Sequence, residues 1–233
     1  LKVLDLTQVL SGPFATLILS DLGANVTKVE KLEGDDSRKF GPIKKNKSSY
    51  FISLNRGKKS IMLNLKENED KIIFEKLLKK SDVLIENFSY GVLKKLGFSW
   101  TYLKKKYPKI IYAKISGFGE TGPYKNLPAY DIIVQAMGGI MSITGNDKEK
   151  YARVGSSIGD IVAGLYCVIG IVSALRARSK TAKGMKIDIS MLDCQVAILE
   201  NAISRYSIQK INPFPLGTHH PNISPFGAFE TND

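Results

Sequence analysis

Cysteine is scarce in this 233-residue sequence, which holds only Cys167 and Cys194. Both lie in apolar, helix-like stretches, so we expect two buried thiols and no disulfide framework. A reducing cytoplasm is the simplest setting for such a chain. Long apolar runs are also missing. The longest candidate, residues 161–175, is interrupted by glycines and is shorter than a membrane-spanning segment requires.

Several catalytic signatures are absent. The sequence has no G-x-S-x-G motif and no P-loop, which removes the basis for a serine-hydrolase or NTPase interpretation. The loop after the first strand lacks G-x-G-x-x-G, so NAD is not indicated. The only histidines, His219 and His220, are adjacent and have no cysteine or acidic cluster beside them. Adjacent side chains do not easily converge on one metal ion, so we expect no metal site.

Positive charge is in excess, with 34 Lys and Arg against 22 Asp and Glu and a net charge of +12. This excess raises the hypothesis of a basic nucleic-acid-binding protein. The lysines, however, are dispersed as pairs and triplets at the ends of separate predicted elements. They fit a solvated surface, or a small polyphosphate ligand, better than a nucleic-acid interface. We therefore expect neither a nucleic-acid nor a membrane partner.

The two ends of the sequence suggest a piece of a longer protein. There is no initiator Met, and the last eight residues resemble a strand entering a turn. No secretory signal is visible at the start, where residues 2–7 are typical of a buried strand.

The first half alternates predicted strands and helices. Strands are expected at 2–7, 24–30, 82–86 and 110–115, with helices at 11–22, 69–80, 91–96 and 101–106. Ser11 is the expected N-cap of the first helix, and Gly23 is its expected end. This alternation predicts an α/β fold: a Rossmann-like, mostly parallel sheet with flanking helices.

The second half has longer helices and fewer strands. Helices are expected at 132–141, 160–178 and 191–206, and a strand at 185–189. Prolines recur from residue 210 onward and indicate an irregular connector. We therefore predict a large Rossmann-like domain over residues 1–206, and a connector to a truncated small domain over residues 207–233.

Two aspartates and one loop are candidates for chemistry. The loop at 9–13 follows a strand and opens a helix, where ligands bind in open α/β sheets, although a plain connection has the same pattern. Asp160 begins an apolar helix after a glycine-rich turn, and Asp131 begins another helix. Each carboxylate has two interpretations, a helix cap or a reactive group that backbone N–H groups keep ionised.

Taken together, these motifs resemble the class III CoA-transferases, a family that includes formyl-CoA transferase, the carnitine CoA-transferases and the α-methylacyl-CoA racemases. The resemblance covers essentially the whole chain. It is carried by residues 3–15, 21–30, 55–60, 82–88, 115–124, 130–131, 135–136 and 159–160.

The resemblance implies two ring-like subunits interlocked as a homodimer, extending well beyond residue 233. It implies transfer of coenzyme A from an acyl-CoA donor to a carboxylic acid. Asp160 would be the nucleophile, forming first an aspartyl anhydride and then an aspartyl-CoA thioester. CoA is then a substrate, and no permanently bound cofactor or metal is required.

The resemblance also assigns a CoA site by position. Lys31 stands near the nucleotide end, residues 63–66 line the adenine pocket, and Lys95 approaches a phosphate. Residues 128–131 approach the pantetheine arm. Lysine ammonium groups suit the CoA phosphates as point charges. The full set is Leu10, Ser11, Lys31, Leu63, Asn64, Leu65, Lys66, Asn87, Phe88, Ser89, Lys95, Pro128, Ala129, Tyr130 and Asp131.

Tyr130 separates two activities within the family. The racemases that this chain resembles carry a His-Asp pair where this sequence has Tyr130-Asp131. Moving an α-proton needs a base tuned near neutral pH, and a tyrosine with a pKa near 10 is a poor one. We therefore expect CoA transfer, with an α-methylacyl-CoA racemase as the alternative.

Overall fold

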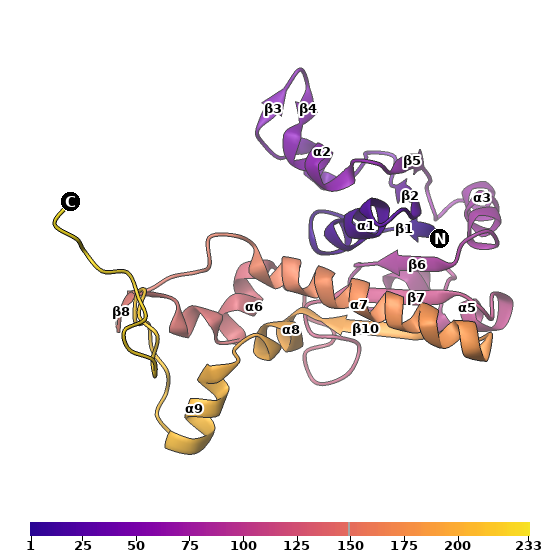
Figure 1. Ribbon diagram of the computed structural model, residues 1–233. Coiled ribbons are helices and arrows are strands. Elements are labelled where there is room, and N and C mark those ends of the chain that lie inside the picture. Colours follow the sequence, from indigo (N-terminus) through magenta and orange to yellow (C-terminus); the bar gives the residue numbers. More distant parts are fainter. Residues whose placement is uncertain (149) are drawn as a thin grey trace.

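A six-stranded parallel sheet forms the centre of the molecule in the computed structural model, which describes residues 1–148 and 150–233 (Figure 1). Every neighbouring strand pair in this sheet is parallel. The prediction of a Rossmann-like parallel sheet is therefore confirmed. In spatial order the strands are β10 (Lys186–Ser190), β7 (Ile111–Ser116), β6 (Val83–Glu86), β1 (Lys2–Asp5), β2 (Asn25–Glu30) and β5 (Lys59–Met62).

The strand order reverses between β1 and β6. The chain leaves β1 through α1 (Ser11–Asp21), on one face of the sheet, and leaves β6 through α4 (Val92–Lys95) and α5 (Trp100–Lys106), on the other. Such a switch point opens a crevice at the carboxyl ends of the two strands, where open α/β sheets bind ligands.

Each face of the sheet has its own apolar core. One core joins the sheet to α1, α6 (Asp131–Met137), α7 (Ile158–Thr181) and α8 (Met191–Ala197). The other joins it to α3 (Asn68–Leu78), α4 and α5. Alternation along β1 explains the division, because Val3 lies in the first core and Leu4 in the second. Cys167 and Cys194 are both buried in the first core, as expected.

Helix α7 is longer than the sequence indicated. It spans 24 residues and is long and apolar enough, by length and composition, to cross a membrane, so the expectation that no segment reaches that length is wrong. One side of the helix is buried against the sheet through Ala163, Cys167 and Ile171. A buried stripe at this spacing is typical of a core helix. Leu165 and Ile169, on the other side, are exposed.

Helices α1 and α7 lie side by side because Gly164 lets them approach (Figure 1). A Cβ atom built on Gly164 would lie 2.8 Å from the Ser11 carbonyl oxygen and 3.0 Å from the Phe14 ring. The chain therefore places the start of α1 directly against α7, one helical turn from Asp160.

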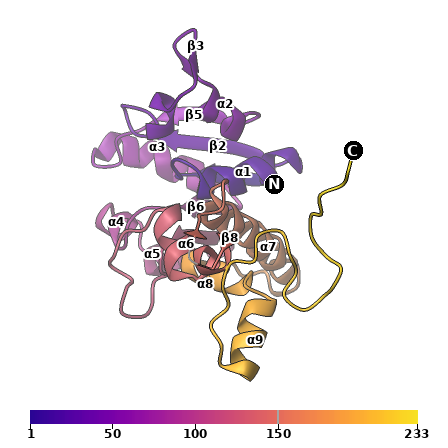
Figure 2. The ribbon, with the colours of Figure 1, turned by 90° about the vertical axis from the view of Figure 1, so that its left-hand side faces the viewer.

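Smaller elements project from this core. At one end lie η1 (Asp36–Lys39), β3 (Ile43–Lys44), β4 (Lys47–Ser48) and α2 (Ser49–Asn55); at the other lies α9 (Asn201–Gln209) (Figures 1 and 2). The remaining elements are η2 (Ile140–Ile143), β8 (Gly145–Asp147) and β9 (Lys150–Tyr151). Among the described residues 210–233 no helix or strand follows α9, in line with the irregular segment expected there.

Two details of the expected elements are wrong. The single helix expected at 191–206 is two helices, α8 and α9, because Glu200 has a φ of 46° and interrupts the helical backbone. Strand β5 and helix α2 were not predicted at all. Most of β5 is exposed at the sheet edge, so it lacks the apolar pattern of the central strands.

Substituting Gly164 tests the contact between α1 and α7. We expect Gly164→Ala to lower the free energy of unfolding by about 1–3 kcal/mol, because the new methyl group meets backbone. Gly170→Ala is the matched control on the same helix, since its nearest neighbours would be side-chain atoms of Ile187, with Cγ2 at 2.9 Å, and not backbone. Chemical denaturation measures both variants. Equal stability of the two would contradict the close approach.

Candidate active site

The loop after β1 enters α1 without the cap that the sequence indicated. Leu10 occupies the N-cap position, α1 has no side-chain cap hydrogen bond, and Ser11 is its first helical residue. The prediction of a Ser11 cap is therefore wrong. The buried Ser11 hydroxyl instead lies 3.5 Å from the Asn87 amide nitrogen, and it lowers the pKa of the nearby Asp160 carboxyl group.

Asn87 connects the two strands of the switch point. It follows β6, and its side chain accepts a hydrogen bond from the Gln8 N–H and donates one to the Gln8 carbonyl, both at 2.9 Å. Asn87 thus holds the backbone of the loop after β1 from across the crevice.

Asp160 lies in the first turn of α7 but does not cap it. Ser157 is the N-cap residue and the helix begins at Ile158, so the interpretation of Asp160 as the cap is wrong. The carboxylate is partly buried. Burial, together with the neighbouring Asp131, raises its pKa to about 6, while the Ser11 hydroxyl acts in the opposite direction. Asp160 therefore lies beside the loop that follows β1.

Asp131 supplies the missing cap of α7 from another helix. Its carboxylate accepts a 2.8 Å hydrogen bond from the Gly159 N–H and a 2.7 Å bond from the Gln135 side chain. Gly159 allows this approach, because a Cβ there would lie 2.6 Å from Val134 and 3.0 Å from the Asp131 carboxylate. The carboxylates of Asp131 and Asp160 therefore lie close together at the start of α7. Asp131 already accepts hydrogen bonds at both of its oxygens.

Tyr50 is a site residue that sequence reasoning missed. It lies in α2, and burial raises the pKa of its phenol, with further contributions from Asp160, Asp35 and Asp131. Its phenol is therefore close enough to the two active-site carboxylates to interact with them. Nothing in the spacing of residues near Tyr50 points to this, since only the packing of α2 against α1 brings it here.

A cleft of about 400 Å³ opens next to the switch point. Gln8 lines it, and Gln8 is also the residue that Asn87 holds. A chain of contacts therefore runs from the cleft through Gln8 and Asn87 to Ser11 and Asp160. Six of the residues assigned to CoA line this cleft: Lys31, Leu63, Asn64, Leu65, Lys66 and Phe88.

The structure separates Lys95 from Lys31. Val92 and Leu96, on one side of α4, line the first cleft, whereas Lys94 and Lys95 line a neighbouring cleft of about 780 Å³ with Trp100. Val92 and Leu96 are one turn apart and lie on the same side of the helix, whereas Lys94 and Lys95 point to another side. Among the other assigned residues, Pro128, Tyr130 and Ser89 are exposed, Leu10 is buried, and Ala129 packs on Gly117.

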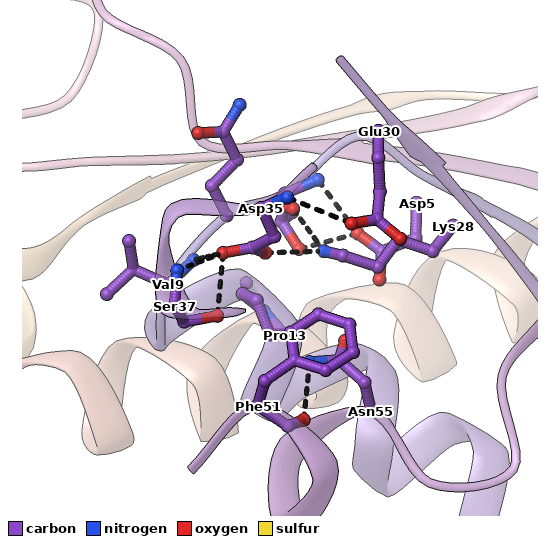
Figure 3. Close-up of polar contacts among 12 residues, drawn as sticks. Asp5, Val9, Pro13, Lys28, Glu30, Asp35, Ser37, Phe51 and Asn55 are labelled. Atoms are coloured by element: carbon purple, nitrogen blue, oxygen red, sulfur yellow. Dashed lines mark hydrogen bonds and ion pairs between the residues drawn. The ribbon is translucent and has the colours of Figure 1, made fainter. Parts of the chain in front are cut away.

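A buried cluster of charges lies under the loop after β1 (Figure 3). Lys28 pairs with Asp35 at 2.9 Å, and Lys58 pairs with Asp5 at 3.4 Å. All four side chains are almost completely buried. Sequence reasoning placed Asp5 and Lys28 in strands but did not predict either ion pair. The apolar pattern of a strand does not indicate which charged side chains come into contact.

The cluster keeps its carboxylates ionised. Burial alone would raise the pKa of Asp5, but Lys28, Lys58 and the hydroxyl groups of Thr16 and Thr7 outweigh it and lower that pKa. Burial lowers the pKa of Lys58 to about 8, although Asp5 acts in the opposite direction. A neutral set of two cations and two anions avoids an uncompensated buried charge.

No metal centre is present in the part of the chain that the structure describes. Within residues 1–148 and 150–233, no three or more His, Cys, Asp or Glu side chains form a group that could hold a metal ion.

The chain is similar to known proteins of one family. The sequence profile of CoA-transferase family III matches residues 1–233. The acetyl-CoA:oxalate CoA-transferase of Acetobacter aceti is 48% identical over 235 residues, and the succinate–glutarate CoA-transferase of Agrobacterium fabrum 41% identical over 241 residues. Each alignment covers 100% of this chain and 60% of the relative. The crystal structure of a CAIB/BAIF family protein from Brucella suis matches with a TM-score of 0.92 and 41% identity, over 97% of this chain and 61% of that chain.

The chain therefore belongs to CoA-transferase family III, which confirms the resemblance seen in its motifs. It spans about 60% of the length of these two relatives.

The raised pKa of Asp160 has a consequence for stability. The carboxyl group titrates near 6 in the folded chain and at 3.8 when unperturbed, so its ionisation opposes folding. The penalty is absent below about pH 4, grows between about pH 4 and 6, and is complete above that range. We expect Asp160→Asn to stabilise the protein by about 1–3 kcal/mol at pH 7 and to have little effect at pH 4.

Thermal unfolding at the two pH values measures this difference. Asp21→Asn is the control, because Asp21 is an exposed carboxylate paired with Arg56. A gain for Asp160→Asn that is the same at both pH values would contradict the raised pKa.

Proposed function

We propose that the protein containing this chain transfers coenzyme A from an acyl-CoA to a carboxylic acid, with Asp160 as the nucleophile. The observation that carries the proposal is the position of Asp160, a partly buried carboxylate beside the loop at the switch point. With a pKa of about 6 it is about nine-tenths ionised at pH 7, so it is available for attack.

The proposed reaction proceeds through covalent intermediates on Asp160. A carboxylate oxygen attacks the thioester carbon, the C–S bond breaks, and an aspartyl anhydride and CoA thiolate form. The thiolate attacks the aspartyl carbonyl, which gives an aspartyl-CoA thioester and releases the donor acid. The acceptor carboxylate then attacks this thioester to form a second anhydride, and the released thiolate takes the acceptor acyl group and regenerates Asp160.

The surroundings of Asp160 suit this sequence of steps. The start of α7 carries partial positive charge, which favours negative charge developing on the reacting oxygens. Asp131 is held by Gly159 and Gln135, so it supports the turn and leaves Asp160 as the reactive carboxylate. Burial of Asp160 weakens its solvation and strengthens its interactions with the reacting groups.

The 400 Å³ cleft is the proposed site for the nucleotide end of CoA. Apolar Leu63 and Leu65 and the ring of Phe88 offer surface to adenine, and Lys31 offers a charge to phosphate. Lys31 is paired with Asp36 at 2.7 Å in an exposed ion pair, and such pairs contribute little stability. The ammonium group is therefore free to exchange this partner for a phosphate.

The acceptors proposed are short carboxylic acids. The names of the relatives include oxalate, glutarate and mesaconate as acids that those enzymes use. Dicarboxylates of this size are the first substrates to test on this protein.

A homodimer is the proposed assembly. Exposed apolar side chains on α7 and α6 would be covered by a second copy of the protein: Leu165, Tyr166, Ile169 and Val172 on α7, with Ile132, Ile133 and Met137 on α6. Burial of such side chains is the main favourable contribution to most protein associations.

Hydroxylamine trapping tests the nucleophile. We expect incubation of the full-length protein with an acyl-CoA and hydroxylamine to leave a hydroxamate on Asp160, located by mass spectrometry, because anhydrides and thioesters of a carboxylate both react with this reagent. Asp160→Ala should abolish transfer to oxalate or glutarate while CoA still binds. Full activity in Asp160→Ala, or an adduct on another residue, would remove the proposed role.

CoA analogues test the cleft. We expect Lys31→Ala to weaken CoA binding by about fivefold, since one exposed cation–phosphate contact contributes about 1 kcal/mol. Calorimetry with CoA and with dephospho-CoA identifies the phosphate involved, and Lys39→Ala is the control for a general loss of positive charge. Equal affinities of Lys31→Ala and the unmodified protein would place the nucleotide elsewhere.

A further inference from the structure

Val9 has a backbone conformation that its side chain disfavours. Its φ is 67°, in the left-handed region that β-branched residues rarely adopt. Such strain persists only where surrounding contacts hold the backbone, and it is frequent at functional sites.

The contacts that hold this loop come from three separate segments. Lys28 on β2 donates a 2.6 Å hydrogen bond to the Thr7 carbonyl, and Asn87 holds Gln8 through both its N–H and its carbonyl. The Val9 N–H donates to the Asp35 carboxylate at 3.2 Å. Three consecutive residues are therefore each held by a side chain from elsewhere in the fold.

The Asp35 carboxylate is held in place by contacts at both of its oxygens (Figure 3). The carboxylate oxygen that accepts from Val9 also accepts from the Ser37 N–H at 2.9 Å and from the Ser37 hydroxyl at 2.7 Å. Its other oxygen pairs with Lys28 at 2.9 Å, and both side chains of the pair are buried. The pair thus contacts the loop at both ends, Lys28 at Thr7 and Asp35 at Val9.

The loop leads directly to the group beside the nucleophile. Leu10 and Ser11 follow Val9, and the missing side chain of Gly164 seats Ser11 against α7 one turn from Asp160. The path from Asp35 to Asp160 therefore runs through the conformation of Val9 and the position of Ser11.

We infer that Asp35 is a positioning residue that, through the Val9 N–H, holds the loop after β1 so that Ser11 stays against α7 beside Asp160. The hydrogen bond between the Val9 N–H and Asp35 is a feature of the structure, whereas its effect on turnover rests on the proposed function. Asp131 also acts on the pKa of Asp160, and Asp160 in turn acts on the pKa of Tyr50. Within the described residues, neither Asp131 nor Tyr50 forms a hydrogen bond with Asp35.

Two double variants separate the hydrogen bond from the ion pair. Lys28→Met/Asp35→Asn and Lys28→Met/Asp35→Leu both remove the buried charges together, which avoids leaving one of them unpaired. Only the Asn variant keeps an oxygen that can accept from Val9. Adding Val9→Gly to the Leu variant supplies a residue that adopts a positive φ without strain.

The first measurement is the titration of the Asp160 carboxyl carbon by NMR. We expect the Leu variant to raise this pKa by about half a unit or more, because the Ser11 hydroxyl, which lowers the pKa of Asp160, is no longer held beside it. Both variants lose the Lys28 hydrogen bond to Thr7, so the comparison is between them: the Asn variant should shift this pKa less than the Leu variant. Adding Val9→Gly should return the Leu variant toward the Asn variant. A purely structural role would lower thermal stability without moving this titration.

The second measurement is CoA transfer. We expect the Leu variant to lose about tenfold in kcat, corresponding to about 1.4 kcal/mol, with a smaller change in KM, and Val9→Gly to recover part of the loss. Asp21→Asn, which removes an exposed ion pair near the other end of α1, is the control that should change neither measurement.

The outcomes distinguish the two proposals. An unchanged Asp160 titration in the Leu variant overturns the positioning role, whatever the activity. A shifted titration in a protein that transfers no CoA supports the positioning role and rejects the proposed function. Hydrogen exchange on the unmodified protein gives a check without substitutions, since rapid exchange of the Val9 amide would also overturn the inference.

Discussion

Two buried ion pairs determine the shape of the crevice at the switch point. A charge removed from water must be paired and hydrogen-bonded, so Asp35 and Lys28, and likewise Asp5 and Lys58, allow few alternative arrangements. The four residues also form hydrogen bonds with the backbone at Thr7, Val9 and Pro13. These ion pairs and hydrogen bonds offset the desolvation of the charges. They also hold the loop after β1 in one defined conformation.

The carboxylate of Asp160, at the start of α7, differs from these paired charges. Asp160 lacks a cationic partner among the groups that act on it, and burial and Asp131 both disfavour its charge. Its pKa of about 6 is a compromise, high enough to keep the group reactive and low enough to leave it ionised at neutral pH. The buried carboxylates of Asp5 and Asp35 are paired with lysines, whereas no cation acts on the proposed nucleophile.

Distant parts of the chain meet at this one point. Gln8 and Ser11 come from the first crossover, Asn87 from the end of β6, and Asp131 from the start of α6. Helix α7 brings Asp160 to the same edge of the sheet because the chain runs back along α7 before entering β10. Glycines at 159 and 164 allow the close contacts, so small residues in an apolar helix are as necessary to the site as its carboxylates.

The sequence by itself determined the parallel α/β architecture, because alternating apolar runs and helix signals depend on local spacing. It also identified Asp131 and Asp160 as residues at helix starts. Only the tertiary structure decided that Ser11 faces Asp160 instead of capping α1, that Lys95 lies in a different cleft from Lys31, and that Tyr50 reaches the site. Local patterns report which face of an element is buried, whereas partners from distant segments depend on how those faces pack.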